Sequence, residues 1–305
     1  METKQSWKAW VYLAPAVILL AVFTFFPIFY TIISSFFEGY KSTKPGVINS
    51  IGIENYLIIL KNKQFLQALR NTFIVTFVTV PLSTIIALLI AVGLNSIKPL
   101  RSALQTIYFL PYVTNSIAIG MVFQIFFQVN TTNGALSGAT NLGTMNQLLG
   151  MLGIEPVLWV NEGASLFNKM FVLCFYIIWN ALPFKIIILL GALQSVNKQY
   201  YDAAKVDGSS RFKIFRKITV PLISPMLLYV VVTGFIGSFK EYSSVVGIFG
   251  ENLRDYEMNT MVGLIYDSLN GYHAGRAAAG AVILFMIILV FTGLQFLVSK
   301  KRVHY

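Results

Sequence analysis

Long hydrophobic stretches with almost no charged side chains alternate along this chain with short polar segments. A helix needs about 20 apolar residues to cross the hydrocarbon core of a bilayer. Six stretches are long enough, so the pattern predicts transmembrane helices at residues 11–37, 71–97, 102–129, 170–196, 218–239 and 277–299. The first stretch is too long for the apolar part of a signal peptide, and we interpret it as a retained helix. The predicted fold class is therefore an all-α membrane protein, with residues 1–305 forming a single transmembrane domain.

The polar segments between these stretches predict the orientation of the chain. With six spans both termini lie on one side, together with segments 98–101 and 198–217. That side holds only three acidic residues but more than half of the 23 basic residues, namely Lys4, Lys8, Lys98, Arg101, Lys198, Lys205, Arg211, Lys213, Arg216, Lys217, Lys300, Lys301 and Arg302. Cytoplasmic loops of membrane proteins carry such an excess. We therefore expect a multi-pass protein of the cytoplasmic membrane with both termini in the cytoplasm.

Composition narrows the class of protein further. The chain is 56% hydrophobic and 11% charged, with a mean hydropathy of +0.70, whereas soluble domains are about 25% charged. The net charge of +11 would suggest nucleic acid in a soluble protein, but topology already explains it, so we expect no nucleic-acid partner. Prolines within or at the ends of the spans favour kinked helices that line a pathway: Pro15, Pro27, Pro81, Pro111, Pro183, Pro221 and Pro225.

Motifs for catalysis or cofactor binding are missing from the sequence. It has no phosphate-binding loop of the form Gly-x4-Gly-Lys-Ser/Thr and no His-Glu-x-x-His. The two histidines, His273 and His304, are far apart, and Cys174 is the only cysteine. We therefore expect no enzyme activity and no cofactor or metal bound by this chain. A membrane enzyme built without a local motif is the least supported alternative.

The cytoplasmic loop at 198–221 has more pattern than a solvated linker needs. Good helix formers run from Tyr200 to Val206, and Gly208 can take the left-handed conformation that ends a helix. Ser209 or Ser210 can cap a second helix, Arg211–Ile218, in which basic and aromatic residues alternate. Small side chains at 203 and 204 leave a face that another protein can approach closely. The pattern predicts two short helices around a glycine, arranged for a partner.

This loop resembles the cytoplasmic "EAA" motif of permease subunits of binding-protein-dependent ABC importers. It matches at Ala203, Ala204, Asp207, Gly208, Phe215, Ile218 and Pro221. It departs at Asp202, where the family has glutamate, and at Ser209, where it has alanine. The resemblance implies that the loop docks on an ATPase subunit, with coupling residues Asp202, Ala203, Ala204, Asp207, Gly208, Phe212, Phe215 and Pro221.

Weaker matches along the chain are most similar to carbohydrate permeases of the maltose type. They are found at Leu13–Ala16, Glu54–Tyr56, Leu69–Thr72, Phe109–Tyr112 and Gly191–Gln194. The resemblance implies a type I ABC importer permease fold and half of the pathway of an ATP-driven sugar importer, with an oligosaccharide favoured. It also implies a second homologous permease, two cytoplasmic ATPase subunits that bind ATP and Mg²⁺, and an extracellular solute-binding protein.

Polar residues inside spans cost free energy and are therefore candidates for the substrate pathway. By position, the resemblance points to spans four and five, and the candidates are Asn115, Ser116, Tyr176, Asn180, Thr233, Ser238, Lys240, Glu241 and Tyr242. Interhelical packing is an equally good interpretation of each. Lys185 either extends toward an interface or pairs with an acidic residue.

Two alternatives stay open from sequence. An importer of a non-sugar solute, such as glycerol phosphate or a polyamine, would need a pathway rich in fixed charge, which this chain lacks apart from Lys185, Lys240 and Glu241. A stand-alone channel or secondary transporter would move solute without ATP and without partners.

Overall fold

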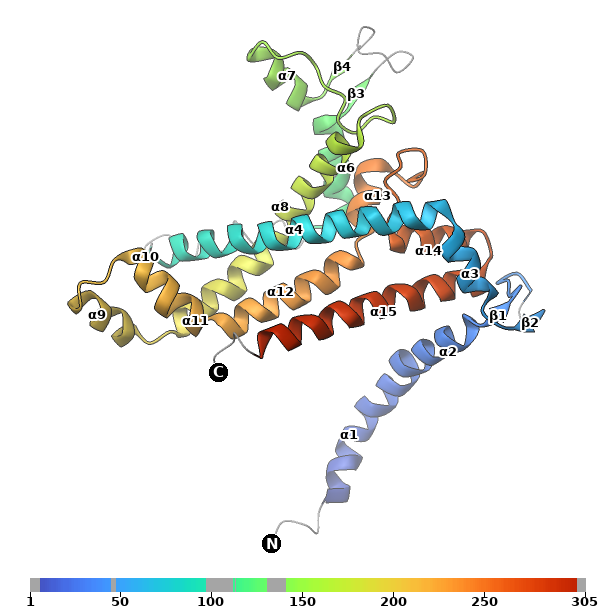
Figure 1. Ribbon diagram of the computed structural model, residues 1–305, viewed down its shortest axis with the longest axis horizontal. Helices are drawn as coiled ribbons and strands as arrows, with labels where there is room; N and C mark the ends of the chain where they lie inside the picture. The colour runs from blue at the N-terminus through green and yellow to red at the C-terminus, as the bar shows by residue number, and fades with distance from the viewer. Residues whose placement is uncertain (1–5, 45–47, 97–111, 113, 131–140, 301–305) are drawn as a thin grey trace. The chain divides into compact units, whose positions relative to one another are not determined.

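A computed structural model describes residues 6–44, 48–96, 112, 114–130 and 141–300. The described residues are mainly helical, with two short antiparallel ribbons, which confirms the all-α class (Figure 1). The chain divides into two compact units, residues 1–66 with 261–286 and residues 67–260 with 287–305. They are described one at a time.

The first unit begins with a long, interrupted helix. It consists of α1 (Ser6–Leu20), a π-helical turn η1 (Ala21–Phe25) and α2 (Phe26–Ser34). Pro27 stands at the start of α2, and a proline without an N–H accounts for the irregular turn before it. Residues Trp10–Ser34 are apolar enough to span a membrane. The helix ends before the predicted boundary at 37, because β1 (Phe37–Glu38) turns away to pair with β2 (Ser50–Ile51).

The rest of the first unit is made of α3 (Glu54–Lys61), α14 (Met261–Asn270) and the start of α15 (Ala274–Ser299). Asn55 of α3 is buried, and its amide donates to the carbonyls of Ser35 at 3.1 Å and Phe37 at 3.0 Å. These bonds tie the end of α2 and the ribbon to α3. Gly275 allows α15 to begin against the same ribbon, since a Cβ there would lie 2.6 Å from the carbonyl oxygen of Phe37.

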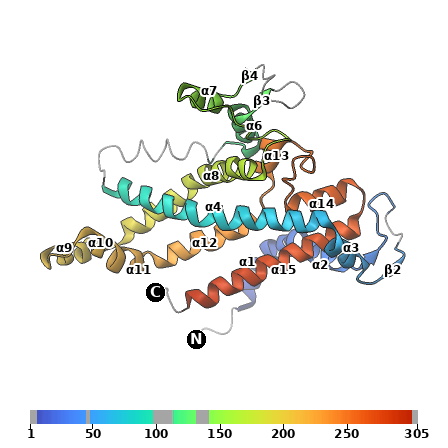
Figure 2. The same cartoon turned by 45° about the horizontal axis from the view of Figure 1, so that its top comes forward.

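The second unit is built around α4 (Lys63–Ser96), α8 (Leu166–Ser195) and α12 (Ser224–Phe239). Figures 1 and 2 show α4 running along α12. One buried apolar cluster joins these three helices through residues such as Ala91, Leu190 and Val230. Close-packed aromatic rings add to the contact between α4, α12 and the end of α15, namely Phe73, Phe77, Phe235, Phe239 and Phe291.

Three predicted spans correspond to single long helices. The second, fourth and sixth are α4, α8 and α15, although α4 begins at Lys63 and α8 at Leu166, earlier than the apolar stretches do. With Trp10–Ser34 they make four described helices that are long and apolar enough to cross a membrane. The polar N-terminal turns of α4 were not predicted as helical, because apolar length marks the part of a helix in lipid and not its continuation beyond lipid.

The fifth predicted span, 218–239, is not one straight helix. The segment Arg211–Leu222 meets α12 at an angle of 69°. Pro225 cannot donate a helical hydrogen bond to the carbonyl of Pro221, and the hydroxyl of Ser224 donates to that carbonyl instead, at 2.7 Å. The bend therefore has a local cause in the two prolines.

The third predicted span is described only in its second half. Residues 102–111 and 113 lie outside the described residues. The described part is α6 (Ser116–Phe127), and the side chain of Asn115 caps its start by accepting from the N–H of Ile117 at 2.8 Å. A helix that starts at a cap is a separate helix, so the described half of this stretch differs from the prediction of one continuous helix through 129. It begins anew at Ser116 and ends at Phe127, and Val129 is already in a strand, whereas the predicted start at 102 lies outside the described residues.

A folded cap follows α6. The strands β3 (Val129–Asn130) and β4 (Asn141–Leu142) pair, and α7 (Thr144–Met151) comes next. Leu148 and Leu152 are exposed. The buried amide of Asn146 holds the cap, because it bonds to both backbone groups of Val157 at 2.8 and 3.0 Å and accepts from the indole of Trp159 at 3.2 Å.

The second unit has a further short helix, α13 (Ser243–Phe249). After α12, α13 lies against α6 where two glycines meet, so that a Cβ added to Gly120 would stand 2.7 Å from the Cα of Gly247. This crossing brings the two helices closer than any side chain would allow.

Candidate functional site

The predicted partner loop forms a helical corner. Its first helix, α9 (Lys198–Val206), starts at Asn197, whose side chain accepts from the N–H of Gln199 at 3.0 Å. It stops at Gly208, which has a φ of +68°. The N–H groups of Gly208 and Ser209 donate to the carbonyls of Lys205 and Ala204, both at 3.0 Å, which is the glycine stop expected from sequence.

The second helix of the corner continues past its predicted end at 218 and reaches Leu222 as three consecutive pieces. Ser210, rather than Ser209, caps α10 (Arg211–Ile214) by accepting from the N–H of Lys213 at 3.4 Å. The chain then passes through a π-helical turn, η3 (Phe215–Thr219), and α11 (Val220–Leu222). The hydroxyls of Tyr201 and Thr219 lie 3.3 Å apart and fasten α9 to this turn. The corner is thus one folded piece.

The outer face of the corner has apolar side chains without a partner among the described residues. Val206 is 88% exposed and Phe212 is 71% exposed. Ala203 and Asp207 are exposed beside them, whereas Ala204 is buried and Phe215 and Pro221 are half-buried. Asp202 forms an exposed ion pair with Lys205 at 3.2 Å, which contributes little stability. Large exposed apolar residues in a charged segment are typical of a protein-binding surface.

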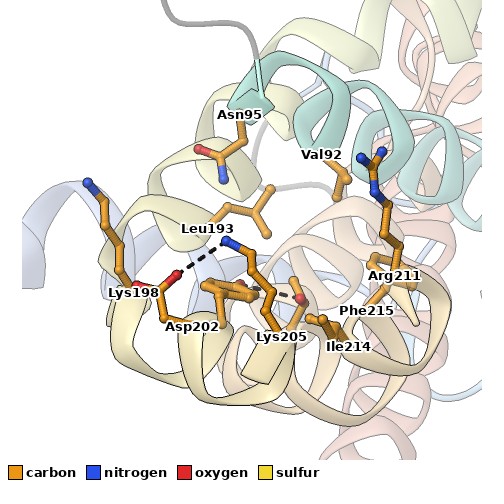
Figure 3. Close-up of a pocket in the computed structure, with 11 residues that line it drawn as sticks. Val92, Asn95, Leu193, Lys198, Asp202, Lys205, Arg211, Ile214 and Phe215 are labelled. Atoms are coloured by element: carbon orange, nitrogen blue, oxygen red, sulfur yellow. Dashed lines mark hydrogen bonds and ion pairs between the residues drawn. The ribbon is translucent and has the colours of Figure 1, made fainter. Parts of the chain in front are cut away.

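A groove of about 390 Å³ lies on the inner side of the corner (Figure 3). The ends of α4 and α8 form its far wall through Val92, Asn95 and Leu193, and the corner forms the near wall. Lys198, Lys205 and Arg211 stand around it with one carboxylate, that of Asp202. Of the predicted coupling residues, Asp202 and Phe215 line this groove.

A second cavity, of about 290 Å³, lies among the apolar helices of the second unit. Its walls come from α4, the start of α6, α8 and α12. Five of the pathway candidates line it, namely Ser116, Asn180, Thr233, Ser238 and Glu241. Thr79 and Ser83 of α4 also line it and were missed from sequence, although hydroxyl residues four apart inside an apolar span were a usable signal.

The other four pathway candidates do not line this cavity. Asn115 caps α6, and Tyr176 is fully buried with its hydroxyl donating to the carbonyl of Ser116 at 2.6 Å. Lys240 is exposed at the end of α12, and Tyr242 packs against a second buried apolar cluster, which includes Val245 and Ile248 of α13. Asn115 and Tyr176 hold the start of α6 in place, so they set the cavity wall without belonging to it.

The cavity combines hydroxyl, amide, carboxylate and aromatic groups. The carboxylate of Glu241 accepts from the N–H groups of Tyr242 at 3.1 Å and Ser244 at 3.0 Å, at the start of α13. The rings of Tyr112 and Phe184 stack with centroids 5.6 Å apart and form an aromatic wall. Such a surface offers hydrogen bonds and a flat apolar face together.

The contacts of Lys185 differ from both interpretations made from sequence, which were extension toward an interface and pairing with an acidic residue. Lys185 is 4% exposed and does not extend to an interface. Its ammonium group donates to α4, to Ser83 Oγ at 2.7 Å, Thr84 Oγ1 at 3.0 Å and the carbonyl of Val80 at 3.3 Å. Within the described part of the chain no acidic side chain forms an ion pair with it. The cation is therefore used to join α8 to α4.

The described residues contain no cluster of three or more histidine, cysteine, aspartate or glutamate side chains placed to hold a metal ion.

Comparison with known sequences gives consistent matches. The profile of the family described as binding-protein-dependent transport system inner membrane component matches residues 83–304. The arabinooligosaccharides transport system permease protein AraP of Bacillus subtilis is 31% identical over 287 residues, which covers 93% of this chain and 87% of AraP. The lactose transport system permease protein LacF of Rhizobium radiobacter is 27% identical over 304 residues, covering 97% and 95%.

A solved structure is similar over nearly the whole fold. It is a chain of a bacterial ABC transporter involved in the import of the acidic polysaccharide alginate, with a TM-score of 0.78 and 20% sequence identity. The match covers 98% of this chain and 96% of that one. At this identity the likeness concerns the fold.

Proposed function

Because the chain belongs to the family of inner membrane components of binding-protein-dependent transport systems, we propose that it is the permease subunit of an ATP-driven sugar importer. An oligosaccharide is the favoured substrate, since AraP is named for arabinooligosaccharides and LacF for lactose. The chain is a multi-pass membrane protein and supplies a transport path, and ATP is hydrolysed in separate subunits.

The proposed topology has six spans and both termini in the cytoplasm. Four described helices and the bent segment that ends in α12 supply five of these spans. The remaining span is the one proposed from sequence at 102–129, and α6 is the described helix within it. The excess of basic residues in segments 98–101 and 198–217 supports this orientation.

One observation supports the coupling role of the α9–α10 corner: Val206 and Phe212 are exposed in a basic segment, which the proposed topology places in the cytoplasm. Leaving such side chains in water costs roughly 1.5–3 kcal/mol each relative to burial. A partner surface that buries them removes this cost, and a small residue at 203 lets that surface approach. We assign the partner as one of two ATPase subunits, whose closure would move the permease through this corner.

The assembly contains further partners. A second homologous permease completes the pathway, and an extracellular solute-binding protein delivers the sugar. The family description names dependence on a binding protein, and the alginate transporter has been solved with its alginate pentasaccharide-bound periplasmic protein. This chain binds no cofactor in the proposal.

The cavity between α4, α8 and α12 supports a sugar over a charged solute. Hydroxyl and amide side chains with a stacked aromatic wall suit the hydroxyls and flat faces of sugars. Glycerol phosphate would need a free cation, and the ammonium of Lys185 is already bonded to three oxygens of α4. A polyamine would need several carboxylates, and among the described lining residues Glu241 is the one with an acidic side chain.

The test is assembly and coupling of the whole importer. The chain is co-expressed with its second permease and ATPases, purified by a tag on this chain, and assayed for ATP hydrolysis with and without the binding protein loaded with arabinotriose, maltotriose or lactose. We expect the ATPases to co-purify and one loaded binding protein to stimulate hydrolysis. If the chain purifies alone, or moves sugar without ATP, the channel or secondary-transporter alternative is correct.

A pair of variants locates the coupling surface. Phe212→Asp should abolish co-purification of the ATPases while the second permease stays bound. Met151→Asp, at an equally exposed apolar side chain on α7, is the matched control and should leave the complex intact. Equal loss in both variants would contradict the assignment of the α9–α10 corner.

A further inference from the structure

A third pocket of the second unit, about 270 Å³, has an unusually polar lining. It lies where the end of α6 meets the segment before α8 and the loop after α13. Its polar lining residues are Gln124 of α6, Gln128 directly after this helix, Asn161 and Glu162 from the segment before α8, and Tyr256 from the loop. We call it the polar pocket. It shares no lining residue with the cavity among the apolar helices.

Buried hydrogen bonds hold the walls of the polar pocket together. Lys169 of α8 is 4% exposed, and its ammonium group donates to the carbonyl of Glu162 at 2.7 Å and to that of Tyr256 at 3.1 Å. One cation thereby joins two opposite walls. The amide of Asn161 bonds to both backbone groups of Val129, at 2.7 and 3.3 Å, and fixes the third wall. The pocket is therefore a preorganised feature of the fold.

The groups that face the polar pocket suit an uncharged polyol. The amides of Gln124 and Gln128 donate and accept, the carboxylate of Glu162 accepts, and Tyr256 offers a ring and a hydroxyl. A sugar hydroxyl likewise donates and accepts. Among the described lining residues Glu162 alone has a charged side chain, and it is exposed. The nearby ammonium of Lys169 is buried in the wall and bonded to two carbonyls, so an acidic sugar meets the carboxylate and would be repelled. The volume is below the range of about 300–1,000 Å³ that encloses a larger ligand, which limits the occupant to a single sugar unit.

The polar pocket also has a consistent position on the transport path. Ser116 of the cavity and Gln124 stand on the same helix, eight residues apart. At 1.5 Å per residue this separates the two sites by about 12 Å along α6. In the proposed topology the segments before α8 and after α13 are extracellular, so the polar pocket comes first.

We propose that the polar pocket is an entry subsite that binds one neutral sugar unit of the substrate before it reaches the cavity among α4, α8 and α12. The inference rests on the proposed sugar import and adds a second site and a preference for uncharged sugars. The inference predicts that a bound sugar makes the residues of the pocket wall less accessible to solvent and to reagents.

The test uses the complete importer in lipid nanodiscs and a thiol reporter in the pocket wall. A Cβ at Gly163 would meet nothing within 4 Å, so Gly163→Cys fits, and Cys174→Ala removes the native thiol. The rate of labelling by a bulky neutral maleimide is measured alone, with maltotriose, with arabinotriose and with the acidic trisaccharide of galacturonic acid. Glu251→Cys, at an exposed residue outside the pocket, is the matched control.

We expect a neutral trisaccharide at about one to nine times its dissociation constant to slow labelling at 163 by about two- to tenfold, because the unoccupied fraction of pockets falls in that proportion. Labelling at 251 should stay unchanged. The acidic trisaccharide should give no protection. Replacing both amides, Gln124→Leu with Gln128→Leu, should abolish protection, and Glu162→Gln should retain it and extend it to the acidic trisaccharide.

The same samples separate this inference from the proposed function. No protection by either neutral trisaccharide, while the loaded binding protein still stimulates ATP hydrolysis, overturns the entry subsite alone. Protection that survives loss of both amides overturns it as well. Failure of the ATPases to co-purify overturns the proposed function itself.

Discussion

The crossing of α6 and α13 gives the sharpest test of how the second unit is packed. A Cβ at Gly120 would stand 2.7 Å from the Cα and 2.9 Å from the carbonyl carbon of Gly247. A Cβ at Gly247 would stand 2.9 Å from the carbonyl oxygen of Ile117. These neighbours are backbone atoms, which cannot rotate away as a side chain can. The two helices must therefore separate if either glycine is replaced.

The magnitude follows from two opposing effects. Carbon atoms pack best about 3.5–4.0 Å apart, so alanine at 120 forces a shift of about 1 Å. Overpacking of this kind costs about 1–3 kcal/mol, whereas alanine in place of glycine gains about 1 kcal/mol of helix propensity. We expect Gly120→Ala to lower the free energy of unfolding by about 0–2 kcal/mol, and Gly120→Val to lower it further.

The assay is thermal unfolding of the purified importer, followed for this chain. Gly191→Ala in α8 is the matched control, because a Cβ there meets nothing within 4 Å, and it should be neutral or stabilising by up to about 1 kcal/mol. A Gly120→Val variant as stable as the wild type would refute the close crossing. So would equal destabilisation by Gly191→Ala.

Three further predictions concern other parts of the chain. Gly208 has a φ of +68° and open space around it, so Gly208→Val should reduce ATP-driven uptake through about 1–2 kcal/mol of backbone strain. Asparagine tolerates this conformation, so Gly208→Asn should retain most of the uptake, and equal uptake by both variants contradicts the strain argument. Asn146→Leu leaves the backbone N–H and carbonyl of Val157 unpaired and should lower the free energy of opening the cap by about 1–3 kcal/mol. The measurement is the rate of proteolysis between β4 and α8, which should rise, and an unchanged rate refutes the prediction. Burial lowers the pKa of His273, so below pH 6.5 the unfolded chain binds more protons than the folded chain, and the unfolding temperature should fall as pH drops through that range. His273→Gln should make this fall less steep, and an equally steep fall in the variant contradicts the prediction.

The sequence by itself determined the class of protein and most of its apolar helices. Apolar length alone identified α4, α8 and α15, because insertion into lipid depends on the summed hydrophobicity of a segment and not on its neighbours. The stop at Gly208 was also readable, since a glycine between two helical patterns acts locally. The spacing of small, acidic and aromatic residues around it identified the loop that resembles the family motif.

Local rules were less reliable where prolines and caps interrupt a hydrophobic stretch. Pro221 and Pro225 indicated a kink near the start of the fifth span, but its position and size did not follow from the sequence. The start of α6 at a capping asparagine was missed, because hydropathy does not distinguish a broken apolar segment from a continuous one. The residues that hold the bend, Ser224 and Pro225, were visible in the sequence. Their effect depended on which carbonyl each could reach.

Only the tertiary structure decided which polar residues meet. Ser116 and Asn180 line the cavity, whereas Tyr176, on the same face of α8 as Asn180, is buried against the start of α6. Lys185 bonds to oxygens of α4, and Lys169 joins two loops that are far apart in the chain. The physical reason is that hydrogen bonds and cavities depend on how each helix is rotated against its neighbours, which periodicity within one helix does not contain.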